Sequence, residues 1–149
     1  QSLGSAWPYF IQIFVAGIED SLPEGQEAGI DEAFLHRVYR EHLIAGPRNK
    51  YLPHMWDRLP KVFSGSELVI AKAVLRQLGR ANDDGLEIEA LSNLAAGALS
   101  QSETLDETEF DYVLEVLSHD GYLFRPPDGP GRMQFFTNVL RDYWRRRHV

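Results

Sequence analysis

Apolar residues in the first part of the chain recur at helical spacing in three stretches. The first is apolar nearly all round, which predicts a largely buried helix that tolerates Pro8 in its first turn. Asp31 is expected to cap the second helix through its carboxylate. Helices are thus predicted over residues 6–20, 32–44 and 50–63, with a loop at 22–29.

The rest of the chain shows helix, turn and strand signals in a definite order. Two short β-type runs, 122–125 and 132–136, flank a Pro- and Gly-rich turn at 126–131 and predict a hairpin. The helical patterns cover residues 66–80, 88–99, 106–119 and 137–147. Three helices followed by a two-stranded wing is the order of a winged helix.

A turn at residues 64–66 is the best boundary between these two parts. We expect residues 1–63 to form a helical subdomain and residues 64–149 to form a winged-helix domain. The predicted fold class is mainly α with one small β-hairpin.

Composition places the chain among ordinary globular proteins, with 44% of residues apolar and 25% charged. The absence of cysteine excludes disulfides and thiolate metal sites and fits a reducing, cytoplasmic location. No stretch is long enough to cross a bilayer, so no membrane contact is expected. Because Gln1 leads almost at once into an apolar helix, we expect the chain to be a piece of a longer protein.

Charge is distributed unevenly along the chain. Residues 1–80 contain nine Lys/Arg and nine Asp/Glu, whereas residues 81–149 contain six Arg and thirteen Asp/Glu. The second part therefore carries the whole net charge of -7. Domains that bind duplex DNA normally show the opposite sign, because neutralising phosphates supplies much of their affinity.

Catalytic and metal-binding patterns are missing from the sequence. The five histidines show no ligand spacing, and no nucleophile motif of the G-x-S-x-G type occurs. Asp83 and Asp84 are better explained as part of a turn than as paired acid–base carboxylates. We therefore expect no catalytic residues, no metal site and no bound cofactor.

One face of the helix at 106–119 is the main candidate site. If its apolar residues face the core, the 100° step of a helix directs five others outward. These are Thr108, Asp111, Tyr112, Glu115 and His119. Their carboxylates would repel phosphates, and none of the five is a good reader of base edges. The face is either simply solvated or a protein-contact surface centred on Tyr112.

Arginines offer a second candidate surface. Arg125 and Arg132 flank the predicted wing, and Arg141, Arg145, Arg146 and Arg147 make the end of the chain basic. They could contact DNA phosphates. Alternatively, the terminal cluster complements the negative end of its own helix, and this interpretation is favoured.

Two segments resemble the C-terminal region of prokaryotic P-loop ATPases of the AAA+/STAND type. Residues 6–12, Ala-Trp-Pro-Tyr-Phe-Ile-Gln, are similar to the signature of the lid helix. Residues 117–123, Leu-Ser-His-Asp-Gly-Tyr-Leu, and residues 135–146 are similar to the end of the appended winged helix. The resemblance implies a helical lid remnant before a winged helix-turn-helix, with Pro8 near the nucleotide that the parent protein binds.

The resemblance also implies a role. ATP and Mg²⁺ would belong to the parent, because the Walker A motif G-x-x-x-x-G-K-[ST] is absent here and this chain alone should not be an enzyme. The leading hypothesis is a non-catalytic interaction and regulatory module that contacts its own ATPase core or another protein. The alternative is a DNA-binding winged helix that uses the wing and the terminal arginines.

Overall fold

The computed structural model describes residues 7–22 and 29–149. Ala6, the predicted start of the first helix, and residues 23–28 of the predicted loop lie outside the described residues. The elements up to residue 63 are α1 (Trp7–Ser21), α2 (Glu32–Val38), the π-helix η3 (Tyr39–Ile44) and α3 (Tyr51–Val62). The sequence predicts these as three helices, and the structure shows them in that order.

The second predicted helix changes its hydrogen bonding halfway along. Asp31 caps its start as expected, since the Asp31 Oδ1 accepts a hydrogen bond of 2.7 Å from the Phe34 N–H. After Val38 the ladder widens to the π pattern, and the Ala45 N–H donates to the Arg40 carbonyl at 3.1 Å. The apolar period cannot distinguish these two ladders, so the sequence predicted one continuous α-helix.

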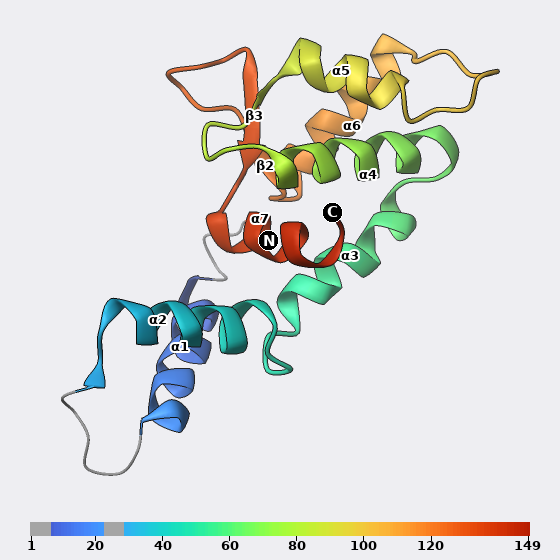
Figure 1. Cartoon of the computed structure of the whole chain (residues 1–149). Helices are drawn as coiled ribbons and strands as arrows, with labels where there is room; N and C mark the ends of the chain where they lie inside the picture. Colours follow the sequence, from blue (N-terminus) through green and yellow to red (C-terminus); the bar gives the residue numbers. More distant parts are fainter. Residues whose placement is uncertain (1–6, 23–28) are drawn as a thin grey trace.

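The remaining elements, from residue 65 onward, are four helices and three short strands (Figure 1). They are α4 (Gly65–Arg80), β1 (Leu86–Glu87), α5 (Ile88–Ala96), α6 (Glu107–His119), β2 (Leu123–Phe124), β3 (Arg132–Phe135) and α7 (Asn138–Arg147). The fold is mainly α with a small antiparallel sheet, which confirms the predicted fold class.

The sheet contains a strand that the sequence did not predict. Its order is β1-β3-β2, with Leu86 opposite Met133 in one pair and Leu123 opposite Phe135 in the other. The hairpin is thus confirmed, and β1 adds a third strand to it. A two-residue strand is too short to show an alternating pattern, and its pairing depends on Gly85, whose φ of 71° bends the chain into register.

Trp144 of α7 lies at the centre of the core and is fully buried. The α7 helix packs against both α4 and η3, so it lies between the first helices and the rest of the molecule (Figure 1). In addition, the Tyr122 hydroxyl donates a hydrogen bond of 2.7 Å to the Met55 carbonyl on α3. The core therefore extends across the predicted boundary at residues 64–66, and the boundary itself stays a prediction.

The prediction that α1 is largely buried was wrong for one side of the helix. Phe10 and Ile13 are buried against η3 and α2, whereas Trp7, Ile11 and Val15 are 46%, 57% and 46% exposed. Helices cover only one side of α1 among the described residues, so its all-round apolar pattern leaves a stripe in contact with solvent. None of the described helices has both the length and the apolar character needed to cross a membrane.

Candidate interaction surfaces

The α6 helix presents the first candidate surface. Asp106 caps its start, because the Asp106 Oδ1 accepts a hydrogen bond of 2.9 Å from the Thr108 N–H. Its apolar side packs against α4 and is fully buried, which fixes the rotation of the helix. The outward side carries the five predicted residues, all exposed: Thr108, Asp111, Tyr112, Glu115 and His119. We call these residues the α6 face.

Tyr112 is the large apolar group of this face and is 48% exposed. The exposed carboxylates of Asp111 and Glu115 lie beside it on the same face of the helix. At the end of the helix, the His119 Nδ1 lies 3.2 Å from Asp120, whose other oxygen pairs with Arg58 of α3 at 3.0 Å. The face can therefore offer an aromatic anchor within negative charge, at the end of a helix that is tied to α3.

The wing arginines are used differently from each other. Arg125 is exposed. Arg132 instead donates from its Nη2 to the Gly85 carbonyl at 3.3 Å, and its Nε lies 3.5 Å from the Glu87 carboxylate. These contacts hold the edge strand β1 against β3. Arg132 is thus largely engaged in maintaining the sheet.

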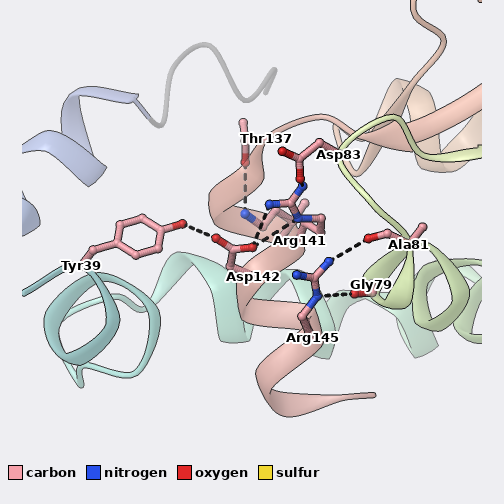
Figure 2. Close-up of polar contacts among 9 residues, drawn as sticks. Tyr39, Gly79, Ala81, Asp83, Thr137, Arg141, Asp142 and Arg145 are labelled. Atoms are coloured by element: carbon pink, nitrogen blue, oxygen red, sulfur yellow. Dashed lines mark hydrogen bonds and ion pairs between the residues drawn. The ribbon is translucent and has the colours of Figure 1, made fainter. Parts of the chain in front are cut away.

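The C-terminal arginines also divide into two groups. Arg145 donates from its Nε to the Gly79 carbonyl and from its Nη2 to the Ala81 carbonyl, each at 2.7 Å (Figure 2). It therefore satisfies carbonyls at the C-terminal end of α4, and not those of its own helix. Arg146 and Arg147 are exposed. Arg145 is exposed as well, so all three arginines reach the surface and one of them also contributes to the fold.

A polar network connects the first helices to α7. The Tyr39 hydroxyl donates to the Asp142 Oδ2 at 2.8 Å, and the Arg141 Nη2 lies 3.1 Å from the Asp142 Oδ1 (Figure 2). Arg141 also pairs with Asp83 in the turn before β1. Burial, followed by the bond to Asp142, raises the pKa of Tyr39 above its usual range. The sequence did not predict this network, since its partners are far apart in the chain and have no local signature.

An open apolar groove lies between α1, the α2–η3 segment and α7. Its volume is about 910 Å³, and its floor includes the buried Phe10, Leu43 and Val139. The exposed Trp7 and Ile11 of α1 lie one helical turn apart along it. The sequence prediction missed this groove, although the apolar pattern on all sides of α1 was a signal for it.

Pro8, the position that the ATPase resemblance assigns to a nucleotide contact, is exposed in the first turn of α1. Comparison of the chain with protein-family models, with curated proteins and with solved structures gives no match. The resemblance to the AAA+/STAND ATPases therefore stays a prediction from the sequence.

Proposed function

We propose that this chain is a non-catalytic, cytoplasmic interaction and regulatory module that contacts a protein through the α6 face. Following the sequence resemblance, the parent is a P-loop ATPase that binds ATP and Mg²⁺, and the partner is its own ATPase core or another protein. The observation that carries the proposal is the exposure of Tyr112 beside two exposed carboxylates, on a helix whose other side is fully buried. Exposed aromatics of this kind are frequent interface anchors.

The order of the elements supports a winged-helix interpretation of residues 64–149. In such a domain α6, the last helix before the wing, is the one that enters a DNA major groove. Here Asp111 and Glu115 would approach phosphates, and each approach would be repulsive. The position of α6 is thus that of a recognition helix, but its exposed face is negatively charged. This combination favours a protein partner over DNA.

DNA binding through the wing and the terminal arginines is the alternative. Arg125, Arg146 and Arg147 are exposed and support it. Arg132 and Arg145 support it less, because their guanidinium groups are engaged by carbonyls within the protein. The three remaining arginines are outnumbered by the thirteen carboxylates of residues 81–149, which disfavours binding to DNA phosphates.

A regulatory role requires the module to transmit a change between its parts. The network of Tyr39, Asp142 and Arg141 is suited to this, since it connects η3 to α7 and α7 to the turn before β1. A movement of the first helices that broke the Tyr39 bond would change the contacts of α7 and of the turn before β1.

Site-specific photo-crosslinking tests the proposal. A photoreactive phenylalanine analogue replaces Tyr112 in cells that produce the parent protein, and in parallel replaces Leu94, which is similarly exposed at 41% but lies on α5. We expect protein crosslinks at position 112 and not at position 94. Equal crosslinking at both positions would contradict a specific surface.

A salt titration with random-sequence duplex separates the DNA alternative. We expect no binding at low salt. Binding with a steep salt dependence that disappears in an Arg146→Ala, Arg147→Ala double variant would instead support the DNA role. Arg145 is left unchanged in this variant because its bonds to Gly79 and Ala81 stabilise the fold.

A further inference from the structure

The groove between α1, α2–η3 and α7 differs in charge from the rest of the molecule. Among the described residues that line it, four arginines (Arg40, Arg141, Arg145 and Arg146) stand against two carboxylates, those of Glu32 and Asp142. The groove rim is therefore net positive by two charges in a chain whose net charge is -7.

Two of the four arginines, Arg40 and Arg146, remain available to a ligand. Arg141 forms ion pairs with Asp142 and Asp83, and these carboxylates neutralise its charge. Arg145 is engaged by the carbonyls of Gly79 and Ala81. Arg40 and Arg146 are exposed, one on η3 and one on α7, so they lie on two of the helices that border the groove.

We propose that this groove binds an amphipathic α-helix of another protein, with acidic residues on both sides of the apolar stripe of that helix. The ridge formed by Trp7 and Ile11 would pack between the apolar side chains of the ligand, as ridges pack into grooves between helices. The arginines at the rim would pair with its flanking carboxylates and fix its orientation. This site is independent of the α6 face.

Charge complementarity distinguishes this occupant from others. A second copy of the chain docked groove to groove would bring the same arginines together, which is unfavourable. A nucleic acid would pair with the arginines but would leave Trp7 and Ile11 against a charged backbone. An acidic amphipathic helix satisfies both the apolar ridge and the basic rim.

Two designed peptides of about 18 residues, roughly 27 Å long as helices, provide the probe. Both carry Leu and Phe at positions i, i+3, i+4 and i+7, and they differ only in having Glu or Lys beside the stripe. Binding is measured by fluorescence anisotropy. We expect the Glu peptide to bind at least about tenfold more tightly than the Lys peptide, and this preference to decrease at high salt.

Variants of the protein locate the binding. Ile11→Glu and the Arg40→Glu, Arg146→Glu double variant alter exposed positions, so folding should be retained. Each should weaken binding of the Glu peptide by at least about tenfold. Leu94→Glu and Arg125→Glu are the matched controls elsewhere on the surface and should leave its affinity unchanged.

Three results would overturn the proposal. The first is equal binding of the two peptides, or no binding of either. The second is an equal loss of affinity in Leu94→Glu and Ile11→Glu. The third is a concentration-dependent dimer in sedimentation that Ile11→Glu abolishes, because a second copy would then occupy the groove.

Discussion

The Tyr39 hydroxyl and the Asp142 carboxylate, separated by 103 positions in the sequence, form a hydrogen bond of 2.8 Å that joins η3 to α7. The bond is partly buried, and its acceptor is also held by Arg141 on the same helix. The Tyr39 bond thus ties α7 to the first helices, and the pair with Arg141 holds the Asp142 carboxylate in place within α7.

Removing the Tyr39 hydroxyl tests the contribution of this bond. Tyr39→Phe keeps the ring but leaves Asp142 with one donor fewer, so we expect the free energy of unfolding to fall by about 1–2 kcal/mol. Urea denaturation measures the change. Tyr112→Phe is the control, since the Tyr112 hydroxyl lies on the exposed α6 face. This variant should unfold at the same urea concentration as the unsubstituted protein.

The sequence predicted the elements whose signals are local. The Asp31 cap and the buried side of α6 each follow from a few neighbouring residues. The five residues of the α6 face were placed outward by the same helical period that buries Phe110 and Leu114.

Features that depend on distant partners could not be predicted in this way. Tyr39 and Asp142 are ordinary polar residues until the fold brings them together. The strand β1 exists only because β3 pairs with it. The exposed side of α1 was misjudged because an apolar helix in sequence does not show how many neighbours will cover it.

Arg145 stabilises the end of α4 through the carbonyls of Gly79 and Ala81. Arg145→Ala removes both donors, so we expect a loss of about 1–2 kcal/mol in the free energy of unfolding. Arg146→Ala should change it by less than about 0.5 kcal/mol, because Arg146 is equally exposed but makes no such bonds to the described residues. Chemical denaturation of the two variants compares them directly. Similar losses in both would contradict the capping role.

Gly85 combines a φ of 71° with close approach of β3, and a Cβ at this position would collide with the Met133 carbonyl. Gly85→Ala should therefore cost at least about 2 kcal/mol and weaken the pairing of β1 with β3. Gly97→Ala is the control, because its nearest neighbour would be an ordinary 3.6 Å contact. It should be neutral or stabilising by up to about 1 kcal/mol. Thermal unfolding distinguishes these two outcomes.

His148 stacks on Trp56 with ring centroids 3.7 Å apart. Burial lowers the pKa of this histidine, and the nearby Arg147, Arg76 and Lys72 lower it further, while Asp57 opposes them. The folded state therefore binds the proton less readily than the unfolded chain. Well above about pH 6.5 the imidazole is neutral in both states, so His148 should not affect the free energy of unfolding. As the pH falls below about 6.5, the unfolded chain takes up the proton more readily, and the free energy of unfolding should decrease.

His148→Phe isolates this contribution, since it keeps an aromatic ring for Trp56 but cannot be protonated. Between about pH 7.5 and 5.5, the midpoint of urea unfolding should decrease with falling pH less steeply in the variant than in the unsubstituted protein. The exposed histidines are present in both proteins and cancel in the comparison. Parallel curves would show that His148 has the same pKa in the folded and unfolded states.

Tyr112 should separate folding from binding. Its side chain is 48% exposed, and Ala favours a helix more than Tyr does, so Tyr112→Ala should change the free energy of unfolding by less than about 0.5 kcal/mol. The same substitution should weaken the partner captured by crosslinking at the α6 face by at least about tenfold, since a central aromatic commonly contributes more than 1 kcal/mol to an interface. Thermal unfolding and titration of the purified partner measure the two effects. A variant that unfolds many degrees lower, or that binds with unchanged affinity, would remove Tyr112 as the anchor of this surface.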